Sequence, residues 1–235
     1  NQNGAKRIRD FGIVPGRVKT GERNAITDVP GIRVGHCTVK TEENHTGVTV
    51  IVPGPDNAFA KHYTAAAYIH NGFGKSAGVV QVEELGTLET PIALTNTLNV
   101  GKVLDAMVEI VIEQCRKDGI EPQSINPVVG ECNDCRINHI QKRAIGEKEV
   151  REAFALASEE FEEGDVGAGA GTTCYGMKGG IGSASRVITI GEKEYTIGVL
   201  VQSNFGATKD FVLNGEAVGP KILEWKQEKS DMAAS

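Results

Sequence analysis

The sequence predicts an α+β fold in which helices cover β-sheets. Segments of β type come first, two helices follow in the middle of the chain, and strands return afterwards, an order typical of that class. Hydrophobic residues make up 40% of the 235 residues and charged residues 24%, so the chain has enough apolar mass to bury a core. We expect a single domain over residues 1–235 without internal repeats.

The first half of the chain carries the β-type segments. Short stretches rich in Val, Ile and Thr, broken by Gly and Pro, predict strands between Ile32 and Val52. Further strands are expected at 65–69, 77–82 and 91–94. Residues 1–24 are basic and rich in turn formers, which predicts an N-terminal arm that packs on another part of the protein.

Two helices are expected in the middle. Apolar residues recur at three- and four-residue spacing over 101–118, and Gly119 supplies a C-terminal stop. The stretch NPVVG predicts a short strand that leads to Glu131. A second helix is expected over 147–163, with Gly164 after it. Its last turn holds acidic residues that oppose the helix dipole, and we expect these to be solvated: Glu159, Glu160, Glu162 and Glu163.

A glycine-rich loop over 164–182 precedes two further strands, at 186–190 and 195–202, joined near Gly191. From residue 215 the chain is polar and ends in KQEKSDMAAS, so we expect a flexible C-terminal tail over 221–235.

Composition excludes several classes of partner. The formal charge is -6 and no cluster of Lys and Arg stands out, which argues against nucleic acid. No apolar run approaches the roughly 18–20 residues of a membrane span, and the N-terminus lacks the apolar core of a signal peptide. Five scattered cysteines do not form a disulfide scaffold. We therefore expect a soluble, cytoplasmic protein that binds neither nucleic acid nor membrane.

Three motifs suggest ligands but favour a structural reading. The glycine-rich loop matches neither the P-loop nor the dinucleotide fingerprint, so we expect its backbone to pass close to another chain or to a substrate. The spacing of Cys132, Cys135 and His139 could begin a zinc site, but no fourth ligand is evident, which favours unpaired buried thiols and a surface histidine. No Ser/His/Asp set can be drawn from the histidines at 36, 45, 62 and 70.

Two polar residues follow predicted strands. Glu131 lies in the turn ECND, where a half-buried carboxylate could pair with an ammonium group or could cap backbone N–H groups. Asn204 lies in QSNFG, where its amide could stabilise an oxyanion or could simply belong to a turn. The residues alone leave both alternatives open.

Several stretches in one order carry a family resemblance. These are RIRDFGI, GERNAITDVPGIRVGH, NGFGKSAG, PIALTNTLNVGKVLDA, VVGECND, GAGTTCYGMKGGIGSASR and VLVQSNFG. Over residues 7–220 the chain resembles the DmpA-type aminopeptidases, also called L-aminopeptidase/D-esterases, which include the β-peptidyl aminopeptidases. Each motif is weak by itself, but the series is specific.

The resemblance implies a four-layer αββα sandwich and a precursor that cuts itself before a serine. That serine becomes the N-terminus of a smaller β chain and is the nucleophile, activated by its own free amine. The enzymes remove N-terminal residues from peptides, amides or esters without metal or cofactor. They typically assemble as tetramers of αβ pairs.

Carried over by position, the resemblance gives Glu131 the role of binding the substrate's free amino group and gives Asn204 a place in the oxyanion hole. Asn133 falls where some members have a Tyr near the active site. Cys135 replaces a common Gly, and Phe73 and Lys75 depart from the usual NGNGE, which puts substrate preference in doubt.

The family's cleavage site and the strand after it do not occur in the sequence, which stops at Ser235. The chain therefore resembles the large α fragment, with 221–235 as the tail before the processing site and the β chain as its missing partner. Two alternatives are an acyltransferase relative of the same fold and a non-catalytic protein that binds a small ligand.

Overall fold

A computed structural model describes residues 6–233. The first sheet contains four strands in the order β1-β2-β5-β6. Its strands are β1 (Arg33–Lys40), β2 (His45–Val52), β5 (Ile92–Asn96) and β6 (Val128–Cys132). The first three run antiparallel, whereas β5 and β6 are parallel. Because β5 and β6 are parallel, their carboxyl ends meet at one edge of the sheet.

The second sheet is a hairpin of β9 (Ile181–Ile190) and β10 (Lys193–Gln202). Short two-stranded ladders complete the β structure: β3 (Tyr63–Thr64) with β4 (Thr87–Leu88), β7 (Thr173–Cys174) with β8 (Met177–Lys178), and β11 (Val212–Leu213) with β12 (Glu216–Ala217).

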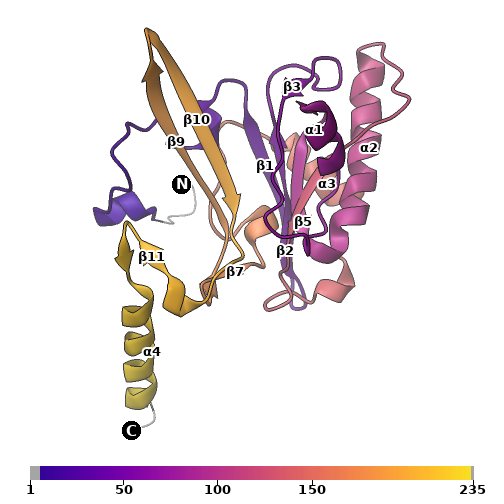
Figure 1. The fold of residues 1–235 in the computed structure, drawn as a ribbon. Helices are drawn as coiled ribbons and strands as arrows, with labels where there is room; N and C mark the ends of the chain where they lie inside the picture. Colours follow the sequence, from indigo (N-terminus) through magenta and orange to yellow (C-terminus); the bar gives the residue numbers. More distant parts are fainter. Residues whose placement is uncertain (1–5, 234–235) are drawn as a thin grey trace.

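Helices lie on one side of the first sheet and the hairpin on the other (Figure 1). The helices are α1 (Val79–Leu85), α2 (Val100–Lys117) and α3 (Glu147–Ala155), while α4 (Gly219–Ala233) projects away from the sheets beyond β11. The order helix, sheet, sheet accounts for three of the four layers of an αββα sandwich. No helix among residues 6–233 is long and apolar enough to cross a membrane.

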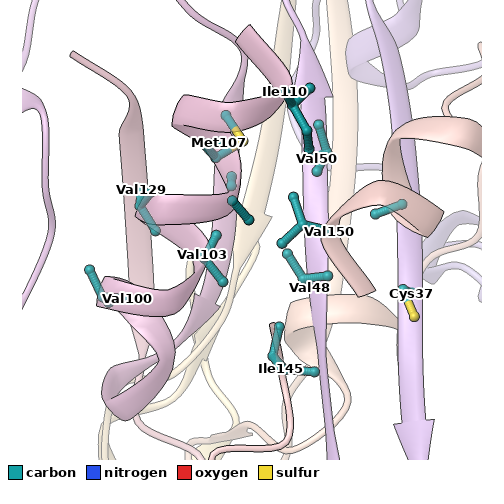
Figure 2. Close-up of a cluster of buried hydrophobic side chains, with 13 residues drawn as sticks. Cys37, Val48, Val50, Val100, Val103, Met107, Ile110, Val129, Ile145 and Val150 are labelled. Carbon is teal, nitrogen blue, oxygen red and sulfur yellow. The ribbon is translucent and has the colours of Figure 1, made fainter. Parts of the chain in front are cut away.

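The core lies between the first sheet and the helices α2 and α3 (Figure 2). Val48, Val50 and Val129 from the strands meet Val103 and Met107 of α2, and all five are fully buried. The apolar residues of α2 share one face because they recur at three- and four-residue spacing. A smaller cluster between the two sheets contains Val166, Ala168 and Ile181, with Leu94 and Leu200 packed against it.

A glycine-rich segment passes between the two sheets. The 3-10 helix η5 (Gly167–Gly169) is buried, and Gly167 has a φ of 50°. A Cβ there would collide with the Thr49 hydroxyl and would come within 2.5 Å of His36 Nδ1. The sequence predicted a close backbone approach for this loop. At η5 the partners are the protein's own strands β1 and β2, whereas Thr173 and Gly176, later in the same loop, line a cavity.

The structure confirms the strands between Ile32 and Val52, the strand near 91–94 and the first long helix. It overturns the strand expected at 77–82, where α1 forms. Ala77 exchanges backbone hydrogen bonds with Val129, and Gly78 then turns the chain at a φ of 81° into the helix. A short apolar run is compatible with a strand and with a helix, so the spacing of its apolar residues does not determine which of the two forms. Residues 65–69 form no strand.

The second predicted helix is shorter than expected, because α3 ends at Ala155 rather than 163. Ser158 exchanges two backbone hydrogen bonds with Val34, at 2.9 and 3.0 Å, which draws the chain onto the edge of β1. Leu156 still donates to the Glu152 carbonyl, and beyond it this pairing takes the place of further helical bonds.

Glu159 and Glu160 are exposed, as expected, whereas Glu162 and Glu163 are half-buried. Glu159 and Glu160 form ion pairs with Arg23, at 2.9 and 3.2 Å. Glu163 is half-buried and pairs with Arg7 at 3.3 Å. Burial raises the pKa of Glu163, and Arg7 opposes that shift only in part. These contacts attach the N-terminal arm, which further binds β9 through Arg7 and the Ser183 carbonyl. Residues 1–5 of the arm lie outside the described part.

The C-terminal segment is helical over 219–233, where a flexible tail was expected over 221–235, and its last two residues lie outside the described part. Pro220 occupies the first turn, where its missing N–H costs nothing. Most of α4 is exposed, since Trp225 and Met232 retain 53% and 69% of their accessible surface. Polarity suggested a tail, but a polar segment can also form a solvated helix.

Replacing Gly167 by Ala should destabilise the fold by about 1–3 kcal/mol, because the added methyl meets Thr49 and His36 and the residue has a positive φ. Gly101→Ala in α2 is the matched control, since nothing lies within 4 Å of the point that its added methyl group would occupy and Ala favours helix. Urea unfolding of both variants measures the difference. Equal midpoints for the two would contradict the close approach.

Candidate active site

The candidate site lies where the two sheets meet at their carboxyl ends. Glu131 is near the end of β6, and Asn204 follows β10 by two residues. Gln202 holds the sheets together there, since its side-chain amide donates to the carbonyls of Thr95 and Ala168 at 3.1 and 2.8 Å. The Cys132 thiol lies 3.6 Å from the Gln202 carbonyl. The two residues singled out on separate strands therefore belong to one site.

Glu131 is half-buried and already accepts two hydrogen bonds. One carboxylate oxygen accepts the backbone N–H of Lys75 at 3.0 Å, and the other accepts the Thr97 hydroxyl at 2.5 Å. Each oxygen keeps further acceptor capacity, because an ionised carboxylate offers about four lone-pair sites. The carboxylate is thus oriented, and it can still bind a cationic group.

Asn133 is exposed and belongs to a tight turn. Its side-chain oxygen accepts the backbone N–H of Cys135 at 3.0 Å, the pattern of an Asx turn. Its amide nitrogen donates no hydrogen bond to any of the described residues. Asn204 is half-buried, and its side chain has no hydrogen bond to the part of the chain between residues 6 and 233. Both amides are therefore free to donate to a ligand.

Two shallow cavities flank these amides and share them. One, of about 220 Å³, contains Glu131, Lys75 and Phe73 among its lining residues. The other, of about 280 Å³, is lined by Cys135, Arg136, Thr173, Gly176, Phe205 and Gly206. Asn133 and Asn204 line both. The site is thus a groove with a carboxylate at one end, two amides in the middle and a guanidinium at the other end.

A buried carboxylate supports the turn after β6. Asp134 is 2% exposed, and its oxygens accept the Thr46 hydroxyl at 2.6 Å and the amides of Asn96 and Asn138, both at 3.1 Å. These partners come from β2, β5 and the following loop. The network fixes the turn that carries Glu131 and Asn133 against the first sheet.

Cys132, Cys135 and His139, the possible zinc ligands, do not form a metal site in the described part of the chain. Within residues 6–233, no group of three or more His, Cys, Asp or Glu side chains is arranged to hold a metal ion. Cys132 is half-buried, and burial raises the pKa of its thiol to about 12, so it stays protonated at neutral pH. Cys135 is exposed, contrary to the burial expected for it, because the Asx turn carries it to the surface.

A larger cavity, of about 320 Å³, lies beneath the N-terminal arm rather than at the sheet ends. It is basic, but Arg7 and Arg186 already donate to backbone carbonyls, including those of Ser183 and Pro15. Those bonds attach the arm to β9. We read this cavity as structural.

Sequence reasoning missed Thr97, Arg136 and the Asp134 network as parts of the site. Thr97 immediately follows β5, the parallel neighbour of β6, and that neighbour relation is what brings it to Glu131. A sequence does not state which strands pair. The ECND turn did contain Asp134, but only the strand order shows that three donors surround it.

These features define a class of protein. An α+β chain with two packed sheets, and a polar groove at the strand ends where they meet, has the architecture of the N-terminal-nucleophile (Ntn) hydrolases. The model of Peptidase family S58 matches residues 24–233, and the chain belongs to that family.

Curated relatives agree. The chain is 36% identical over 239 residues to the beta-peptidyl aminopeptidase BapA of Sphingosinicella xenopeptidilytica, and 37% identical over 226 residues to BapA of Sphingosinicella microcystinivorans. These matches cover 97% and 92% of the chain but 59% and 56% of the relatives. The chain therefore spans little more than half the length of the curated relatives.

Solved structures share the fold. A Burkholderia beta-aminopeptidase matches with a TM-score of 0.86 and 39% identity, over 92% of the chain and 62% of its own. The L-aminopeptidase D-Ala-esterase/amidase of Ochrobactrum anthropi, a prototype for the serine aminopeptidases and a variant of the Ntn hydrolase fold, matches with a TM-score of 0.83 and 32% identity, over 92% and 62%. The PH0078 protein from Pyrococcus horikoshii OT3 matches with a TM-score of 0.90 and 42% identity, over 94% of the chain and 65% of its own. The αββα sandwich predicted for the chain is confirmed as the fold of this family.

Replacing Asp134 by Ala should lower the free energy of unfolding by about 2–4 kcal/mol, because Thr46, Asn96 and Asn138 would lose a buried acceptor. Asn133→Ala, one residue away but exposed, should change it by about 0.5 kcal/mol or less. Denaturant titration measures both. A similar effect of the two substitutions would show that the network does not hold the turn.

Proposed function

We propose that this chain is the α subunit of a self-cleaving serine aminopeptidase. In this proposal the rest of the precursor is a β chain whose N-terminal serine is the nucleophile, and α4 leads toward the processing site. The substrates are peptides, amides or esters with a free amino terminus, and the assembly is a tetramer of αβ pairs. The proposal rests on family membership together with a groove that offers an oriented carboxylate and free amides.

The exposed surface of the second sheet supports the proposal that a β chain packs there. Strand β10 pairs only with β9 among residues 6–233. One face of β10 carries an apolar stripe that stays 42–49% exposed: Tyr195, Ile197, Val199 and Val201. A two-stranded sheet with an open edge and an exposed apolar face is an unfinished layer. Strands and helices of a β chain would extend this sheet and add the fourth layer.

The mechanism assigns one task to each group. The substrate's ammonium pairs with Glu131, whose geometry is held by Thr97 and the Lys75 backbone. The serine hydroxyl attacks the scissile carbonyl, and the serine's own amine accepts the proton. Asn204 donates to the oxyanion that forms, and Asn133 lines the bound substrate. Collapse of this intermediate expels the leaving amine, and water then releases the acyl group.

Glu131→Gln should lower kcat/KM for peptide and amide substrates about 10- to 100-fold, because a charge-assisted hydrogen bond to the ammonium becomes a neutral one. An ester or amide that lacks the free amine makes no such bond, and its slow cleavage should change little. Steady-state kinetics of the assembled enzyme on the two substrate types measures this. Equal losses on both would exclude the amine-binding role.

Asn204→Ala should lower kcat about 100- to 1,000-fold while KM changes little, because an oxyanion-hole donor acts mainly in the transition state. Asn133→Ala is the matched control, since it removes an amide from the same groove. Its effect should fall mainly on KM. An Asn204 variant with an unchanged turnover number would refute the oxyanion assignment.

Formation of the nucleophile can be tested separately. Mass spectrometry of the purified gene product should find two fragments, the smaller beginning with serine. A single uncut chain that retains activity would overturn the self-processing part of the proposal and leave the roles of Glu131 and Asn204 to the kinetics above.

A further inference from the structure

The proposed function implies the direction in which a substrate lies along the groove, and the inference drawn from that direction rests on the proposed function. The substrate's amino group binds Glu131 in the smaller cavity, and its carbonyl lies at Asn204, which lines both cavities. The residue that leaves must therefore extend into the cavity of about 280 Å³, beyond Asn204. Arg136 is the cationic residue that lines that cavity.

Arg136 is unengaged. It is exposed, and within residues 6–233 it has no hydrogen bond or ion pair. Arg7 and Arg151, by contrast, are occupied: Arg7 binds Glu163 and three backbone carbonyls, and Arg151 pairs with Glu113 and Glu147. A free guanidinium in a groove presents its planar fork to an anion, and a carboxylate fits that fork through two parallel hydrogen bonds.

The other cation of the groove is not equivalent. Lys75 lines the cavity that holds Glu131, but its ammonium donates to the Phe73 carbonyl and lies 3.7 Å from the centroid of the Phe73 ring. Its charge is thus partly used within its own loop. The two charged ends that remain for a ligand are the Glu131 carboxylate and the Arg136 guanidinium.

The two amides lie between these charged groups, since Asn133 and Asn204 line both the cavity of Glu131 and the cavity of Arg136. In an extended peptide, consecutive Cα atoms are about 3.8 Å apart, so the amine and carboxylate of a dipeptide are separated by little more than one residue. Asn133 and Asn204 lie between the two cavities and would face the peptide bond. We propose that Arg136 binds the C-terminal carboxylate of the leaving residue, which makes the enzyme prefer substrates such as dipeptides, whose leaving residue has a free C-terminus.

The test compares acids with amides on the assembled, processed enzyme. The probes are alanyl-alanine and β-alanyl-alanine, each with its C-terminal amide, which differ only in the charge at that end. The unmodified enzyme should show a KM about three- to tenfold lower for the acid of the pair it cleaves. Arg136→Gln should raise KM for the acid to that of the amide and leave kcat and the amide's KM unchanged. Arg136→Lys should keep part of the preference.

Arg116→Gln is the matched control, because it removes the same charge from an exposed position on α2 outside the groove, and it should keep the preference. Raising the salt concentration should shrink the preference in the unmodified enzyme and not in Arg136→Gln. The inference is overturned if Arg136→Gln keeps the acid-to-amide ratio, or if Arg116→Gln abolishes it equally. If no probe is cleaved by the unmodified enzyme, the proposed function itself fails, and this inference falls with it.

Discussion

The close contact of a glycine-rich backbone with strands β1 and β2 is the constraint on which the rest of the structure depends. Side-chain hydroxyls of these strands take the place of sheet partners: Thr38 accepts the N–H of Gly167 at 2.8 Å, and Thr49 accepts the N–H of Ala168 at 3.0 Å. His36 lies 2.9 Å from the same Thr49 hydroxyl, and burial lowers the pKa of this histidine, which keeps it neutral. Only a segment without bulky side chains can lie this close to a sheet.

The site inherits its geometry from that contact. Because η5 sits against the first sheet, the Ala168 carbonyl is available to Gln202, which binds it together with the Thr95 carbonyl of β5. These bonds fix the position of the last residue of β10, and they thereby restrict the position of Asn204, two residues further on. On the other side, the Asp134 network fixes the turn after β6. Two sheet ends therefore carry Glu131 and Asn204, and the loop that holds Phe73 and Lys75 completes the groove.

The two sheets differ in completeness. The first has a core on its helical side, in which Val48, Val103 and Met107 are fully buried. The second exposes the apolar stripe of β10 and one strand edge. Hydrophobic area of this kind is normally buried, because its exposure to water costs free energy and invites association. The polypeptide thus has one sheet with a buried core and one sheet whose apolar face stays exposed among the described residues.

The sequence by itself determined the local structure wherever a pattern was long or strong. The spacing of apolar residues predicted α2, the runs of Val, Ile and Thr predicted β1 and β2, and the ordered motifs identified the family. Glu131 and Asn204 were singled out because each follows a predicted strand.

The tertiary structure decided the features that depend on partners distant in the chain. Pairing of Ser158 with Val34 ended α3 early, the Ala77–Val129 pairing set the start of α1, and the parallel neighbours β5 and β6 brought Thr97 to Glu131. The physical reason is that local propensity contributes only tenths of a kcal/mol per residue, whereas pairing and burial between distant segments contribute more.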